Sequence, residues 1–105
     1  MTSEQLKEIG ARISERRKML NYTQEQIAEK MDVSIQMVSN LERGNKAIKI
    51  ENLIKISDIL DVSTDYILTG KHTVKDLHSI VDRVYKLSDR DYKMIDMLIE
   101  YCSNK

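Results

Sequence analysis

The sequence contains no proline, tryptophan or phenylalanine, and its single cysteine is Cys102. A core must therefore be built from isoleucine, leucine, valine and methionine with a few tyrosines, and the absence of alternating apolar runs favours an all-α fold. One cysteine cannot form an internal disulfide, which is compatible with a reducing compartment. The chain also lacks a signal peptide and a long apolar run, so we expect a cytoplasmic protein with no membrane contact.

Net charge is absent as well, because 17 lysines and arginines balance 17 aspartates and glutamates. Many DNA-binding domains are basic, since neutralised phosphates supply most of the non-specific affinity. If this chain binds DNA, its basic charge must act locally, with a modest dependence of affinity on salt. Two groups of basic residues could supply such a patch: Arg12, Arg16, Arg17 and Lys18, and then Arg43, Lys46 and Lys49.

Patterns that carry catalysis or ligand binding are also lacking. His72 and His78 have no cysteine or carboxylate cluster at ligand spacing, so no metal site is predicted. Cys102 has no evident base partner, and no glycine-rich phosphate loop is present. We therefore predict that the protein is not an enzyme, and we predict neither a cofactor nor a small-molecule substrate.

The most informative stretch is residues 23–44, TQEQIAEKMDVSIQMVSNLERG, which predicts two short helices joined by a tight turn. Thr23 and Gln26 have the spacing of a capping box at the start of the first helix. Val38 and Leu41 form the inner face of the second helix. Four residues of that helix point away from the inner face: Ile35, Gln36, Ser39 and Asn40. Such a helix-turn-helix can enter a DNA major groove and read base edges.

Three further helices are predicted around this motif. The first runs from about Ser3 to Leu20, and its buried stripe consists of Leu6, Ile9, Ile13 and Leu20. The fourth spans about residues 50–60, and its predicted buried residues are Ile50, Leu53, Ile54 and Leu60. A short fifth helix begins after Ser63 and is closed by Gly70.

These segments together resemble the Cro/repressor-like helix-turn-helix family, also called the xenobiotic-response-element family. The resemblance runs from about residue 9 to 70 and rests on IGARISERRKMLNYTQEQIA, the DVS turn, NLERGNK, IENLIKISDILDVS and DYILTG. It implies a five-helix lambda-repressor-like DNA-binding domain over residues 1–70, with the third helix in the major groove. Asp32 replaces the usual glycine and must adopt a left-handed conformation, and Lys49 replaces the usual serine or threonine cap.

The amides of Gln36 and Asn40 lie four residues apart on one helix face and match the N6 and N7 edge of adenine. The resemblance implies that Ile35, Gln36, Ser39 and Asn40 face the groove, where Ile35 can touch a thymine methyl. Phosphate contacts are predicted for Gln24, Arg17, Arg43, Asn45 and Lys46. The family also implies that a basic residue of the first helix pairs with Glu42. For Arg16 we therefore expect either this pairing or a phosphate contact.

Residues 71–105 are predicted to form a C-terminal helical hairpin. Apolar residues recur at near-heptad spacing in its first helix, and the second helix is apolar on more than one side. We therefore expect the hairpin to be a homodimerisation element; the alternative is that both helices pack on the bundle. The predicted interface residues are Leu77, Ile80, Val84, Tyr92, Ile95, Leu98, Ile99 and Cys102.

Two functions remain open at this point. The first is a sequence-specific regulator of transcription that binds double-stranded DNA, with repression from an inverted-repeat operator by a dimer as the family expectation. The second is a protein-interaction module, antitoxin-like or bound by a small protein antagonist, with weak or secondary DNA binding. The zero net charge motivates the second hypothesis.

Overall fold

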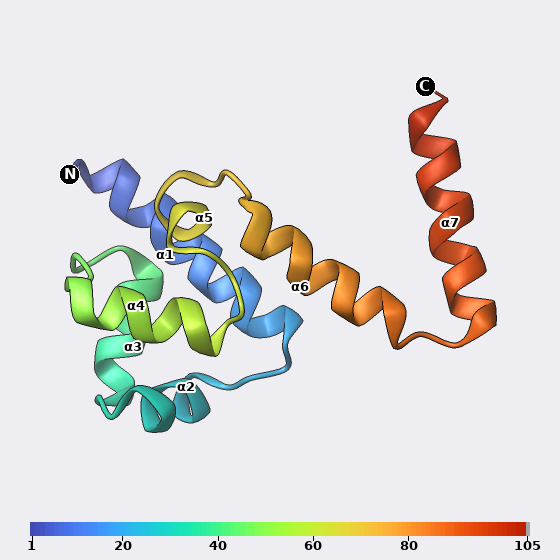
Figure 1. Ribbon diagram of the computed structural model, residues 1–105. Coiled ribbons are helices and arrows are strands. Elements are labelled where there is room, and N and C mark those ends of the chain that lie inside the picture. The colour runs from blue at the N-terminus through green and yellow to red at the C-terminus, as the bar shows by residue number, and fades with distance from the viewer. Residues whose placement is uncertain (105) are drawn as a thin grey trace.

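The computed structural model describes residues 1–104, and over this range it contains helices without strands. Five helices form a bundle and two extend from it, which confirms the predicted fold class (Figure 1). The bundle helices are α1 (Ser3–Met19), α2 (Gln24–Met31), α3 (Ile35–Arg43), α4 (Ile50–Ile59) and α5 (Thr64–Thr69). The extension, which we call the arm, consists of α6 (Val74–Tyr85) and α7 (Asp89–Ser103).

Local polar signals determine where the motif helices begin and end. Thr23 Oγ1 accepts a hydrogen bond from the Gln26 amide at 3.0 Å, and Gln26 Oε1 accepts one from the Thr23 amide at 2.8 Å. This is the predicted capping box. Asp32 ends α2 with a φ of 58°, the predicted left-handed conformation. Lys49 precedes α4 without a capping side-chain hydrogen bond.

The core lies among the five bundle helices and is mostly aliphatic. Its most deeply buried side chains are Ile13, Ile27, Met31, Val38, Ile56, Leu60 and Ile67. The prediction for α4 is wrong in part, because Ile50 is 78% exposed and Ile54 is 53% exposed. Two apolar stripes run along α4, and the core covers only the one that contains Ile56. Periodicity alone could not tell which stripe would face inward.

A close approach between α1 and α3 positions the helix-turn-helix. It occurs at Gly10, where an added Cβ would lie 2.4 Å from the carbonyl oxygens of both Leu41 and Glu42. Real Cβ atoms essentially never come this near, so only glycine allows the two backbones to meet without displacement. One side of α3 is thereby packed against α1, which leaves its opposite side toward solvent.

The arm consists of two helices joined by the short turn at residues 86–88. In Figure 1, α6 leads away from the bundle and the chain then reverses direction, so that α6 and α7 form an open V. No side chain of α7 is buried, and α7 stands apart from the bundle (Figure 1). The inside of the V is an apolar groove of about 420 Å³, lined among others by Leu77, Ile80, Val84, Tyr92, Ile95 and Ile99.

Candidate nucleic-acid interface

The solvent side of α3 carries the four predicted base-reading residues. The core buries Val38 from the same helix, whereas Ile35 and Gln36 are exposed and Ser39 and Asn40 are half-buried. The structure therefore brings the predicted residues together on one helix, away from the core. The four side chains share the side of α3 that the core leaves uncovered.

Hydrogen bonds connect the polar side chains along this face. Gln36 Nε2 donates to Asn40 Oδ1 at 3.1 Å, and Arg43 Nη2 donates to the same oxygen at 3.4 Å. The three residues are spaced by four and three positions, as neighbours on a helix surface are. Because Oδ1 of Asn40 accepts both bonds, its NH₂ group is the side of the amide that can donate to a base acceptor.

Glu42 holds α3 to the two preceding helices. Its Oε2 accepts a hydrogen bond from Arg17 Nε at 2.7 Å, and its Oε1 accepts from Arg17 Nη2 at 3.0 Å and from Gln24 Nε2 at 3.0 Å. Burial raises the pKa of Glu42, but the hydrogen bonds from Arg17 and Gln24 outweigh this effect and place the pKa below its ordinary value. The carboxylate is thus ionised at neutral pH, and its bidentate pair with Arg17 fixes the position of α3.

This arrangement corrects the predictions for two arginines. Of the two alternatives expected for Arg16, the pair with Glu42 is not formed, because Arg17 occupies that place with a side chain only 11% exposed. Arg17 is therefore held in the bundle and not at the exposed position that a phosphate contact needs. Arg16 Nε instead donates to the carbonyl oxygen of Leu60 at 2.9 Å, and Nη2 lies 3.5 Å from that of Asp61. It binds the carbonyl end of α4, a favourable place for a cation.

The remaining predicted phosphate residues lie around the end of α3. Gly44 ends the helix with a φ of 75°, and Arg43, Asn45 and Lys46 are exposed on either side of it. Gln24 is half-buried, and its amide group donates to Glu42. The basic residues on this loop thus remain available to a DNA backbone, whereas Gln24 first supports α3.

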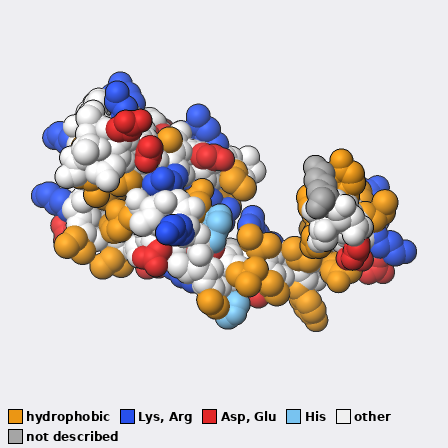
Figure 2. Space-filling model, turned by 90° about the horizontal axis from the view of Figure 1, so that it is seen from above, with side chains coloured by type: hydrophobic (Ala, Val, Ile, Leu, Met, Phe, Trp, Pro, Cys, Tyr) orange, Lys and Arg blue, Asp and Glu red, His pale blue; other side chains and the backbone are white. Residues whose placement is uncertain are grey.

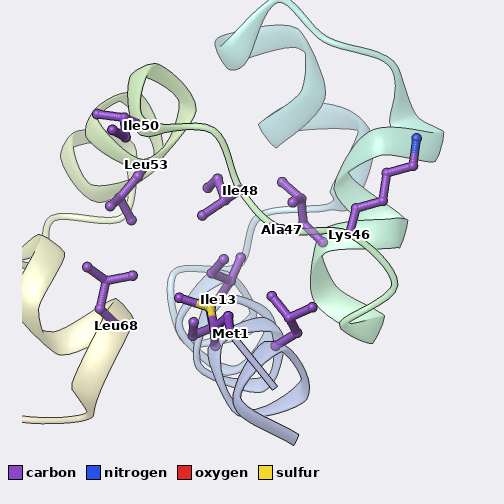
Figure 3. Close-up of a pocket in the computed structure, with 11 residues that line it drawn as sticks. Met1, Ile13, Lys46, Ala47, Ile48, Ile50, Leu53 and Leu68 are labelled. Carbon is purple, nitrogen blue, oxygen red and sulfur yellow. The ribbon is translucent and has the colours of Figure 1, made fainter. Parts of the chain in front are cut away.

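A small apolar pocket lies behind this loop. It has a volume of about 200 Å³ and is lined by Met1, by residues of α1, α3, α4 and α5, and by the 46–48 segment (Figure 3). Figure 3 shows that the amine of Lys46 points away from the pocket. The lining is otherwise apolar, without the converging polar groups that orient a small ligand. The pocket therefore does not change the assignment of Lys46 to the exposed surface.

Gly10 is the functional position that sequence reasoning missed. Its signal was a glycine inside an otherwise regular helical pattern, which costs helix stability and therefore indicates a packing or functional reason.

Within residues 1–104, no group of three histidine, cysteine, aspartate or glutamate side chains could hold a metal ion. None of the helices in this range combines the length and apolarity needed to cross a membrane.

Comparisons with known proteins agree with this geometry. A family model described as helix-turn-helix matches residues 13–67. The HTH-type transcriptional regulator ImmR of Bacillus subtilis is 34% identical over 89 residues, covering 79% of this chain and 70% of ImmR. The cryptic phage CTXphi transcriptional repressor RstR of Vibrio cholerae is 32% identical over 95 residues, covering 88% of this chain and 84% of RstR.

A solved structure supports the fold of the bundle and the arm together. One chain of the SinR protein/SinI protein complex matches with a TM-score of 0.58 and 24% sequence identity. The match covers 92% of this chain and 99% of that chain. At this identity the similarity shows the shared fold.

Proposed function

The chain belongs to the helix-turn-helix family and is a DNA-binding regulator of transcription, and from this premise we propose that it represses transcription by binding an inverted-repeat operator as a dimer. The observation that carries the proposal is the exposed polar face of α3, held in place by the buried pair between Arg17 and Glu42. The relative RstR is named a repressor. Repression also requires only that the operator be occupied. A regulator of transcription must reach the chromosome, and we therefore propose a cytoplasmic location for this protein.

In the proposed complex α3 lies in the major groove. The Gln36 amide carries both a donor and an acceptor and so matches the N6 and N7 edge of adenine, while Ile35 contacts a thymine methyl. Ser39 and the NH₂ group of Asn40 reach bases one helical turn further along. Arg43, Asn45 and Lys46 bind the phosphates beside the groove and set the register of α3 without reading sequence.

Replacing Gln36 by alanine is expected to weaken operator binding by about 1–3 kcal/mol and to relax the preference at one base position. Lys46→Ala should instead weaken binding to all sequences alike and reduce the salt dependence. Both variants can be compared with wild type by selecting bound duplexes from a random pool at about physiological salt. Lys93→Ala, a matched loss of charge on exposed α7, serves as the control. An unchanged affinity and sequence preference in Gln36→Ala would rule out α3 as the recognition helix.

Dimerisation is proposed to occur through the arm. Figure 2 shows hydrophobic side chains gathered along the extension, where the bundle does not cover them. Both helices contribute large exposed apolar residues, among them Leu77, Ile80, Tyr92, Leu98 and Ile99. Contiguous apolar surface of this kind marks an interaction site. A second copy of the chain offers the same surface, so a two-fold pairing of arms covers both at once.

Ile99→Asp tests this interface. We expect the dimer dissociation constant to rise by at least about 100-fold, because two-fold symmetry buries the new carboxylate twice. Ile54→Asp is the matched control, since Ile54 on α4 is 53% exposed and Ile99 is 57% exposed. Size-exclusion chromatography with light scattering measures the mass of each variant. A wild type that is monomeric at tens of micromolar would contradict the proposal.

A second candidate function assigns the arm to a different protein. The SinR protein is found in complex with the SinI protein, and the open groove between α6 and α7 could take a small protein antagonist in the same way as a second copy. A stoichiometric partner that co-purifies from the native host and binds the arm would favour this function. Loss of that partner in Ile99→Asp, with DNA binding retained, would assign it to the groove.

A further inference from the structure

The contact between α6 and the bundle, which we call the joint, is polar. The buried side chains of α6 are Asp76 and Ser79, and no apolar side chain of this helix is buried. The buried contacts that hold α6 to the bundle are therefore hydrogen bonds, beside which the rings of Tyr66 and His72 stack with their centroids 4.5 Å apart. Polar contacts are directional, so a joint of this kind can define an angle.

Asp76 makes most of the hydrogen bonds in the joint. Its Oδ1 accepts from the Ser63 amide at 2.7 Å, and its Oδ2 accepts from Ser63 Oγ at 2.6 Å and from the Thr73 amide at 2.8 Å. Ser63 Oγ also accepts from the Tyr66 amide at 3.0 Å and so caps α5, while Thr73 is the N-cap of α6. One carboxylate that is 3% exposed thus joins the N-termini of two helices.

The other contacts in the joint are fewer or more exposed. Ser79 Oγ donates to Asp61 Oδ2 at 2.5 Å, one helical turn after Asp76. Lys75 Nζ lies 3.3 Å from Asp58 Oδ1, but both side chains are at least half exposed, and such pairs contribute little. Asp76 is therefore the residue on which the direction of α6 chiefly depends.

We propose that Asp76 is the positioning residue that fixes the angle between the bundle and the arm, and that this angle selects the spacing between the two operator half-sites. The inference rests on the proposed binding of an inverted repeat by an arm-paired dimer, in which half-site spacing mirrors the geometry of the dimer. The 12 residues of α6 span about 18 Å. A rotation of about 20° at its first turn would move its far end by about 6 Å, roughly two base-pair steps.

Asp76→Asn tests the proposal with almost no change in side-chain shape. Its NH₂ group cannot accept a hydrogen bond, so part of the contact with Ser63 and Thr73 is lost. Binding is measured to a series of inverted repeats with constant half-sites and spacers that differ by one base pair, and to a single isolated half-site. We expect wild type to bind one spacing best. In the variant, the ratio between the affinity for this spacing and the affinities for the others should fall about tenfold. Affinity for the isolated half-site and the dimer dissociation constant should stay unchanged.

Two further variants make the outcome decisive. Asp82→Asn is the same chemical change at an exposed position of α6 and should keep the wild-type spacing preference. Ser63→Ala removes one hydrogen bond to Asp76 and should broaden the preference less than Asp76→Asn does, and it decides the question if Asp76→Asn does not fold. If the folded Asp76→Asn and Ser63→Ala variants keep the sharp spacing preference of wild type, the inference is wrong and the proposed function stands. A wild type that binds no inverted repeat overturns the proposed function, and the inference with it.

Discussion

Gly10→Ala is expected to destabilise the protein by about 2–3 kcal/mol, although alanine is the better helix former. The new Cβ would lie 2.4 Å from the carbonyl oxygens of Leu41 and Glu42. These are backbone atoms of α3, so no side chain can rotate away to make room. Relief requires α1 and α3 to separate, which opens the core and displaces α3. The free energy of unfolding in urea measures the effect.

The sign of this change separates packing from helix propensity. If propensity alone mattered, Gly10→Ala would stabilise the protein by up to about 1 kcal/mol. Ala11→Gly is the matched control on the exposed side of the same helix, and it should cost about 1 kcal/mol through propensity. A stabilised Gly10→Ala variant would show that the two helices do not need this contact.

Features encoded by neighbouring residues could be predicted from the sequence. The capping box of Thr23 and Gln26, the left-handed Asp32 and the end of α3 at Gly44 each depend on side chains within a few positions. The order of helices follows from such signals, and so does the outward face of α3, because Val38 and Leu41 define its inner side. The candidate base-reading residues were found for this reason.

Features set by tertiary contacts could not be predicted in the same way. Arg16 and Arg17 are adjacent in sequence but about 100° apart around the helix, so only the placement of α1 against α3 decides which one meets Glu42. Ile54 is apolar, yet the core is already filled by the other stripe of α4. The direction in which α6 leaves the bundle likewise depends on the joint at Asp76, and no periodicity describes it.

Arg17→Met is expected to cost about 3–5 kcal/mol, the cost of leaving one member of a buried ion pair without its partner. The Glu42 side chain is 5% exposed, so water cannot replace the two hydrogen bonds that Arg17 donates to it. The double variant Arg17→Met, Glu42→Met should recover most of the loss, because replacing both members of such a pair by apolar residues is often nearly neutral. Urea unfolding of the two single variants and the double variant gives the coupling energy.

The cost of Arg17→Met should also depend on pH. The folded pKa of Glu42 lies below its ordinary value, because the bonds from Arg17 and Gln24 outweigh burial, so its ionisation stabilises the wild type above the unfolded pKa of about 4.3. That stability is lost as the pH falls through the lower folded pKa. Without Arg17 the buried carboxyl protonates more readily, so the difference from wild type should be largest at neutral pH and narrow below about pH 4. A difference that stays constant would instead assign the loss to the packing of the Arg17 side chain, and the ion pair would no longer explain how α3 is held for binding DNA.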